Sequence, residues 1–421
     1  MSDTTTWSVR DVAGIAQFRS YWVATVADSV AAGLWSATLL WVGAGAANHI
    51  AGSLVIAAGV APALLLAPFG GIVVDRVGSG RILVVTTALR TVLLAVWAVL
   101  GVGDVDNLVL LGLVAMGFDG LAGLHNPAIG AYVSTFLPPD AAPAARSAEA
   151  TGQRVAQLVG IALGGSLLAA SLGRAVVGTV AVAASLLGFV LYALIYRSAG
   201  DRTGSQARSR VGGEPFGRRV LRGLQIIGQH VVLRRTITTQ LVGSAMAEGA
   251  VIVGVPFLIR EHQLPGIAFP LGVTATFLGV FVGTLATALR VERIGHLPRH
   301  GLLAFGSAAV AIVAIGLIGG RAWPVTVLLA GAVGFGMASG GPALTGWAGR
   351  QVQTMAERNG EAVMGRFSAV IAIAMQADNV GVIAVGVLAA WWGIDAAIVA
   401  FGVVLLLTVA WGLSARAVRE A

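Results

Sequence analysis

The chain has 421 residues, of which 57% are hydrophobic and 11% are charged, and its mean hydropathy is +0.87. A soluble globular domain carries about 25% charged residues, so this composition excludes one and predicts a membrane protein. The chain has no cysteine, which excludes disulfides, thiolate metal sites and cysteine nucleophiles. All 27 basic residues are arginines that lie between apolar runs, so the net charge of +8 does not predict a nucleic-acid partner.

Apolar runs of membrane-spanning length fill most of the chain after the polar residues 1–17. The first run is longer than the core of a signal peptide, so we expect a retained span. A spanning helix needs about 20 apolar residues. Twelve runs meet this length: 18–43, 50–74, 82–101, 108–133, 150–171, 176–196, 236–259, 270–289, 301–318, 324–347, 363–390 and 396–415. They predict an all-α integral membrane protein with twelve transmembrane helices.

The arginines are distributed unevenly between the two sides of these spans. With the N-terminus inside, the outer loops hold only Arg174, Arg260 and Arg321, and most other arginines lie on the inner side or at its edge. Basic residues concentrate in cytoplasmic loops. The pattern therefore predicts a multi-pass protein of the cell membrane with both termini in the cytoplasm.

The longest polar stretch divides the chain into two sets of six spans. Its first half is rich in Gly, Ser and Arg and is typical of a flexible linker. Residues 219–233 space their apolar side chains at helical intervals, which predicts an amphipathic helix on the inner surface. We expect an N-terminal six-helix bundle at 1–197, a cytoplasmic linker at 198–235 and a C-terminal six-helix bundle at 236–421.

A short motif, acid-Arg-aliphatic-Gly, occurs at the same loop of each half. Both copies follow the second span of their half, on the predicted inner side. The first copy is Asp75, Arg76, Val77 and Gly78 with Arg81 after it, and the second is Glu292, Arg293, Ile294 and Gly295 with Arg299 after it. Two six-helix halves in parallel repeat form one large class of transporter.

The stretch from Gly71 to Arg81 resembles the signature G-x-x-x-D-R-x-G-x-x-R of the major facilitator superfamily, and the resemblance extends over nearly the whole chain. Phe18-Arg19, Asp28, Arg90 and Gly365-Arg366 resemble the bacterial drug, macrolide and siderophore exporters of that superfamily.

Two positions depart from that exporter group. The segment Gly160-Ile161-Ala162-Leu163-Gly164-Gly165 is similar to the antiporter signature G-P-x-x-G-G, but Ile161 replaces the proline. Thr87 stands where these exporters often have an acid.

The resemblance implies a gating role for the repeated loops, in which the loop acid docks against the start of helix 11 when the inner gate is shut. The alternative is that the loops only set the topology. The residues concerned are Gly71, Asp75, Arg76, Gly78, Arg81, Glu292, Arg293 and Gly295.

Charges inside spans are costly and usually face a cavity or a partner. The intramembrane charges predicted to serve proton coupling or to line the substrate cavity are Asp28, Asp119, Glu248, Asp378, Arg90 and Arg154. Asp28 and Glu248, in the first span of each half, are our first choice as proton carriers. Asp119 and Asp378 are equally compatible with a structural role, and Arg90 is expected to pair with a buried acid.

Uncharged residues in the spans are given mainly packing roles. Gly160, Gly164 and Gly165 are expected to allow close helix packing, or to let that helix bend. His125 is expected to be a packing residue rather than a proton carrier. Trp35 and Phe118, near mid-span, could instead contact an apolar substrate.

These features predict a secondary transporter that exports bulky apolar or amphipathic small molecules, such as drugs, in exchange for protons. Its expected partners are substrate, protons and the lipid bilayer, and it is expected to act as a monomer without a cofactor or a bound metal. A siderophore or metabolite transporter, exporting or importing, is the alternative. A membrane-embedded enzyme or a scaffold is remote, because the spans show no H-E-x-x-H, aspartate-rich diphosphate or phosphate-loop motif.

Overall fold

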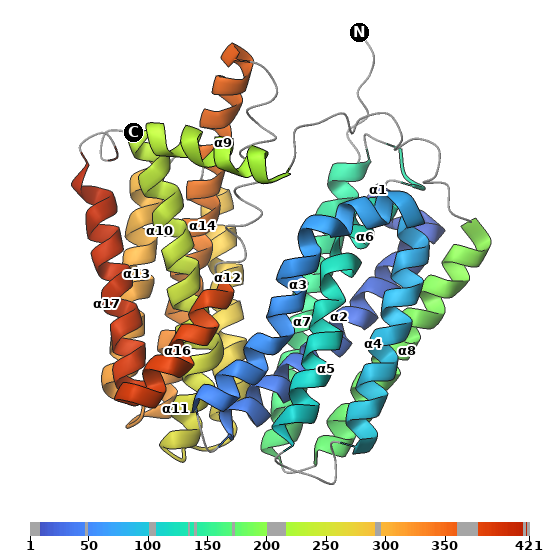
Figure 1. The fold of residues 1–421 in the computed structure, drawn as a ribbon, viewed down its shortest axis with the longest axis horizontal. Helices are drawn as coiled ribbons and strands as arrows, with labels where there is room; N and C mark the ends of the chain where they lie inside the picture. The colour runs from blue at the N-terminus through green and yellow to red at the C-terminus, as the bar shows by residue number, and fades with distance from the viewer. Residues whose placement is uncertain are drawn as a thin grey trace. The chain divides into compact units, whose positions relative to one another are not determined.

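The computed structural model describes residues 9–46, 49–100, 107–133, 135–138, 141–170, 173–199, 216–290, 296–359, 378–415 and 418. Within these ranges the regular structure is entirely helical (Figure 1). Each of the twelve predicted apolar runs is helical over most of its described residues, so the all-α membrane fold is confirmed.

The first half of the chain forms a short entry helix and seven further helices. They are α1 (Val9–Ala13), α2 (Ala16–Ala44), α3 (His49–Val77), α4 (Ser79–Leu100), α5 (Leu108–Gly120), α6 (Ala122–Val133), α7 (Ala142–Ala169) and α8 (Arg174–Ala199). The predicted fourth span is broken at Leu121 into α5 and α6. Glycines at 117, 120 and 123 flank the break, and glycine weakens a helix interior.

The second half begins with an amphipathic helix and continues through the remaining spans. Its helices are α9 (Phe216–Gln229), α10 (Val231–Glu248), the π-helix η3 (Gly249–Gly254), α11 (Val255–Glu261), α12 (Ala268–Arg290), α13 (Leu297–Ile318), α14 (Trp323–Asn359), α16 (Asp378–Trp392) and α17 (Ile394–Ser414). Helix α14 extends well past the predicted end of its span at residue 347. That extension is polar, so an apolar run did not reveal it.

Nine helical stretches of the described chain are long and apolar enough to cross a membrane. The other three predicted spans correspond to α3, α7 and α16. Helix α7 is less apolar because Gln153, Arg154 and Gln157 interrupt it. The first part of the predicted eleventh span lies outside the described residues, and α16 accounts for the remainder.

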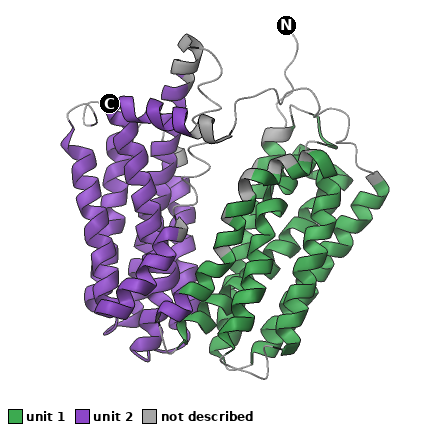
Figure 2. Ribbon diagram, viewed as in Figure 1, with its two compact units in different colours: residues 1–46, 54–211 green, residues 47–53, 212–421 purple. Residues whose placement is uncertain are grey.

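The chain divides into two compact units (Figure 2). Unit 1 comprises residues 1–46 and 54–211, and unit 2 comprises residues 47–53 and 212–421. The main division therefore falls inside the segment predicted as a linker. In unit 1, α2 packs along α7 and α8, and α4 packs along α8 and α6. In unit 2, α14 packs along α12 and α13, and α13 also packs along α17.

One face of the amphipathic helix α9 packs against other helices of unit 2. Ile227 is buried in a cluster with Leu233 of α10 and Val352 of α14, whereas Leu221 and Leu224 are exposed. The helix ends at Gln229, four residues earlier than the sequence predicts, because the chain turns at His230 before α10 begins.

Candidate functional site

The interior of unit 1 contains a buried ion pair between two helices. Asp28 of α2 and Arg90 of α4 are 4% and 5% exposed, and Arg90 Nη1 lies 2.7 Å from Asp28 Oδ2. The Arg90 guanidinium also lies over the ring of Phe118, 4.0 Å from its centroid. Arg90 therefore has a buried acid beside it, and that acid is Asp28.

His125 of α6 joins this pair. Its Nε2 lies 3.2 Å from Asp28 Oδ2, and its Nδ1 lies 2.9 Å from the hydroxyl of Thr86. The Thr86 hydroxyl donates its own hydrogen to the carbonyl of Ile82, at 2.7 Å. The Thr86 hydroxyl therefore lies within hydrogen-bond distance of both the His125 ring and the backbone of its own helix.

The ring of His125 thus bridges two helices. Its Nε2 faces the carboxylate of Asp28 on α2, and its Nδ1 faces the hydroxyl of Thr86 on α4. Asp28, Arg90, His125 and Thr86 therefore form one buried polar network in unit 1.

Asp119, the second acid of unit 1, occupies a different environment. It is half-buried near the end of α5, and Trp35 Nε1 donates a hydrogen bond to its Oδ2 at 3.1 Å. The carboxyl lies against Gly59 of α3, where a Cβ would come 2.5 Å from Oδ2. Among the described residues, no basic side chain lies within ion-pair distance of Asp119.

Trp35 and Phe118 are buried in this region rather than facing a cavity. Each is 1% exposed, and their ring centroids are 5.6 Å apart. Substrate contact by these two rings therefore stays a prediction. Both rings lie in the packed interior, where the Trp35 N–H is committed to Asp119.

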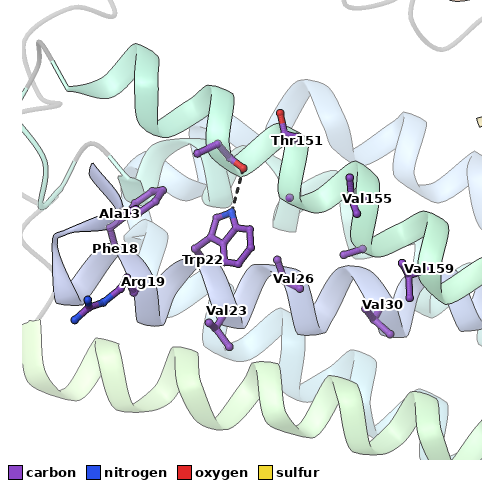
Figure 3. Close-up of a pocket in the computed structure, with 13 residues that line it drawn as sticks. Ala13, Phe18, Arg19, Trp22, Val23, Val26, Val30, Thr151, Val155 and Val159 are labelled. Atoms are coloured by element: carbon purple, nitrogen blue, oxygen red, sulfur yellow. Dashed lines mark hydrogen bonds between the residues drawn. The ribbon is translucent and has the colours of Figure 1, made fainter. Parts of the chain in front are cut away.

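An apolar groove of about 860 Å³ runs between α2 and α7 (Figure 3). Trp22 points from α2 towards α7, and its Nε1 donates a hydrogen bond to the carbonyl of Ala148 at 3.0 Å. Its indole lies on Gly152, where a Cβ would come 2.6 Å from Nε1. Arg19 is the one charged residue of the lining, which otherwise consists of Ala13, Phe18, Trp22, Val23, Val26, Val30, Ala148, Thr151, Gly152, Val155, Ala156 and Val159.

In unit 2, Glu248 is the last residue of α10 and is partly buried where the π-helix η3 begins. Gly249 follows it and packs against α16, because a Cβ there would lie 2.6 Å from the carbonyl of Gly381. Single-turn π-helices inside spans are frequent at functional sites. The structure therefore places Glu248 at a local irregularity of its helix.

The two remaining predicted charges inside spans are Arg154 and Asp378. Arg154 is exposed on α7, and Asp378 is the first residue of α16, with its side chain outside the described part. The structure therefore does not place Arg154 beside the buried pair of Asp28 and Arg90.

The first of the repeated loops is a tight reversal. Gly71 and Asp75 lie in α3, whose last residue is Val77, and α4 begins at Ser79. Gly78 between them has φ of 97°, which glycine adopts without strain. Arg76 and Arg81 are exposed on either side. The second loop, with Glu292, Arg293 and Gly295, lies outside the described residues.

The glycines of α7 lie against α2. A Cβ on Gly160 would come 2.9 Å from the Cα of Gly33, and one on Gly164 would come 3.0 Å from the Cβ of Ala37. Gly165 is buried on the same helix. The small residues therefore allow α2 and α7 to pack backbone to backbone.

Sequence reasoning discounted or missed several residues of this interior. His125 was given a packing role, and Thr86, Tyr192 and Glu149 were not considered. For Glu149 a signal existed, because Pro143 favours the first turn of a helix and so places Glu149 within the helix rather than before it. Tyr192 and Thr86 gave no signal, because hydroxyl residues are common in spans.

Comparisons with known proteins agree with this architecture. The sequence profile of the Major Facilitator Superfamily matches residues 18–377. No curated protein sequence matches the chain.

Solved structures share the fold at low sequence identity. The nucleoside transporter NupG is 12% identical with a TM-score of 0.68, covering 97% of this chain and 100% of that one. The peptide transporter POT in complex with sulfate is 15% identical with a TM-score of 0.68, covering 98% and 96%. The profile match spans most of the chain, and the chain therefore belongs to the Major Facilitator Superfamily, as a secondary transporter rather than an enzyme.

Proposed function

We propose that the chain exports bulky apolar or amphipathic small molecules across the cell membrane in exchange for protons, by alternating access. Both termini lie in the cytoplasm in this proposal, and the protein acts as a monomer. The observation that carries it is the contact of 3.2 Å between His125 Nε2 and Asp28 Oδ2, beside Arg90.

The charge of this buried network changes with one proton. The charges of Arg90 and Asp28 cancel, so a proton bound beside them adds one net positive charge, which is costly in a low-dielectric interior. Binding of a cationic substrate and of the proton at the same time would therefore be unfavourable. Such competition is the simplest linkage for exchange.

The groove between α2 and α7 supports an apolar substrate. Its volume of about 860 Å³ lies within the range of roughly 300–1,000 Å³ typical of small-molecule sites. Valines and aromatic side chains make most of its wall, so an apolar molecule gains burial there without leaving polar groups unpaired.

The driving force is sufficient for such exchange. One proton moving through about 100 mV yields about 2.3 kcal/mol. One pH unit adds about 1.4 kcal/mol. Together they support a gradient of roughly 500-fold in a neutral solute, at about 1.4 kcal/mol per decade.

The other predicted residues keep the roles that the sequence suggests. Glu248 remains the proposed carrier in unit 2, with Asp119 and Asp378 as further candidates. The loop of Asp75 and Arg76 remains the proposed inner gate.

Transport in proteoliposomes tests the proposal. Purified protein would be supplied with an amphiphilic fluorescent dye under an imposed pH gradient, and dye and proton movement would be recorded together. We expect accumulation with proton counterflow in the wild type. Asp28→Asn, His125→Gln and Glu248→Gln, singly and combined, would lose gradient-driven accumulation and keep dye binding.

Glu261→Gln is the matched control, because it makes the same carboxyl-to-amide change at an exposed position. Accumulation and proton flux by the combined variant at the wild-type level would overturn the assignment of these carriers. A wild type that moves the dye without protons would overturn proton coupling itself.

The alternative substrate class is a specific siderophore or metabolite, exported or imported. The similar structures bear the names of a nucleoside and a peptide transporter, and at 12–15% identity they support only the fold. A panel of drugs, siderophores, nucleosides and peptides in the same vesicles would decide among these classes.

A further inference from the structure

The amphipathic helix α9 leaves part of its apolar face exposed. Ile227 is buried in a cluster with Leu233 and Val352, whereas Leu221 and Leu224 are 63% and 51% exposed. With 3.6 residues per turn, Leu224 lies about 60° and Leu221 about 120° around the helix from Ile227. The two leucines therefore continue the buried apolar face on one side, and we call them the apolar flank of α9.

The opposite side of α9 is polar. Gln225 and Gln229 are exposed, and each lies about 160° around the helix from Ile227. A helix with one apolar and one polar face binds in the plane of a membrane surface, with the apolar face among the lipids and the polar face in water. Unit 2 covers the part of the apolar face at Ile227, and the apolar flank is left for another partner.

The chain holds α9 close to the edge of the bilayer. Only His230 separates the end of α9 from α10, and Val231 begins a stretch long and apolar enough to cross a membrane. Figure 1 shows α9 running crosswise to α10 at one end of that helix. One residue spans at most about 3.6 Å, so the C-terminal end of α9 lies at the boundary between lipid and water.

Arg235 gives an independent sign of this boundary. From the first turns of α10 its Nη1 donates hydrogen bonds to Ser414 Oγ, at 2.6 Å, and to the carbonyl of Trp411. Its guanidinium lies over the indole of Trp411, 4.8 Å from the ring centroid, and Trp411 is 40% exposed. Exposed tryptophans concentrate at membrane–water interfaces. The start of α10 and the end of α17 therefore lie at the level of the interface, beside α9.

The charge around the apolar flank is entirely positive. Residues 216–235 contain five arginines and no acidic residue. Arg222 and Arg234 are exposed, and Arg234 Nη1 donates a hydrogen bond to the carbonyl of Gly228 at 3.3 Å. A guanidinium has five N–H donors, so Arg234 can hold this carbonyl and a phosphate together. Basic segments beside a span are attracted to anionic lipids.

The size of the apolar flank favours lipid over a protein partner. A stable protein interface buries about 800 Å² on each side, which two leucines cannot supply. Acyl chains and phosphates suit a small apolar strip with arginines at its borders. We propose that α9 docks on anionic phospholipids at the bilayer surface, with Leu221 and Leu224 among the acyl chains and Arg222 and Arg234 on the phosphates. This docking does not depend on which solute the protein moves.

Lipid contact can be measured at single positions, because the chain has no cysteine and one introduced cysteine is its only thiol. Leu224→Cys in the full chain would carry a bimane fluorophore in vesicles of phosphatidylglycerol with brominated acyl chains, which quench bimane on contact. We expect most of the emission to be lost. Leu221→Cys gives a second reading of the apolar flank. Gln229→Cys, on the polar face, is the control and should keep its emission.

The headgroup preference is tested by changing lipid, salt and arginines. In brominated phosphatidylcholine, quenching at residue 224 should be weaker, because each arginine raises the ratio of docked to free helix about fivefold on an anionic surface. Salt at 1 M, with a Debye length of about 3 Å, should remove this difference. Arg222→Gln combined with Arg234→Gln should also remove it. Arg321→Gln, at an exposed arginine away from α9, is the matched control.

Three outcomes would overturn the proposal. Equal emission at residues 224 and 229, with both open to iodide in the water, would show that the apolar flank faces water. Protection of residue 224 from both lipid and iodide, increasing with protein concentration, would show that a second copy covers it. Equal quenching in phosphatidylglycerol and phosphatidylcholine would show that anionic headgroups are not recognised. Each result stands apart from the transport assay.

Discussion

Gly33 of α2 and Gly160 of α7 approach so closely that a Cβ built on either one would lie 2.9 Å from the Cα of the other. The atoms in the way belong to backbone, which cannot move aside as the end of a side chain can. Both helices also line the apolar groove that contains Trp22, and Asp28 lies on α2. The spacing of α2 and α7 is therefore set by two residues that have no side chain.

Gly160→Ala is expected to force these helices apart. The added methyl group would meet the carbonyl of Val30 and the backbone of Gly33. Overpacking of this kind costs about 1–3 kcal/mol of unfolding free energy. Thermal unfolding in detergent would show a lower Tm. Gly130→Ala is the matched control, because nothing lies within 4 Å of a Cβ there, and an equal loss in both variants would contradict the close approach.

Breaking the ion pair of Asp28 and Arg90 is expected to be costlier than removing both charges. Arg90→Gln leaves the Asp28 carboxylate buried without its cation, which costs about 3–5 kcal/mol. Adding Asp28→Asn to it should recover a large part of this loss. A double-mutant cycle on unfolding free energy measures the difference. Additive effects of the two substitutions would show that the pair is not coupled.

Gly152→Ala is expected to change the groove without touching the charges. Its methyl group would displace the Trp22 indole, which lies directly on Gly152. We expect weaker binding of an apolar dye, seen as a higher KM with the same proton stoichiometry. Trp22→Phe keeps a six-membered aromatic ring in the groove and removes the pyrrole part of the indole with the N–H donated to Ala148, so its effect should be smaller. An unchanged KM in Gly152→Ala would exclude the groove from substrate binding.

Asp75→Asn is expected to impair the proposed inner gate. The substitution removes one charge at the end of α3, at the predicted edge of the membrane, so folding and membrane insertion should be preserved. Transport should fall severely, because a helix N-terminus attracts an anion and not a neutral amide of the same shape. Transport by purified Asp75→Asn at the wild-type rate would refute the gating role.

The sequence by itself determined the membrane fold. Twelve apolar runs, an uneven distribution of arginines and a motif repeated at equivalent loops are all local or periodic properties, and the bilayer imposes helical structure on each run. The sequence also indicates why residue 78 is glycine: the chain reverses within one residue between α3 and α4, and that reversal requires a positive φ. The sequence also identified Asp28 and Arg90 as costly charges that require partners.

Only the tertiary structure decided which partners those charges have. Asp28, Arg90 and His125 come from α2, α4 and α6, and no spacing along the chain states that three helices turn these faces to one another. The partner of the Trp35 N–H is likewise a matter of packing: it donates to Asp119, because a buried N–H needs an acceptor. Pro143 indicates that Glu149 lies within a helix, but the burial of Glu149 depends on how α2 and α8 pack around α7. Hydrogen-bond partners depend on how helices pack, and a periodic sequence pattern fixes only which residues share a helix face.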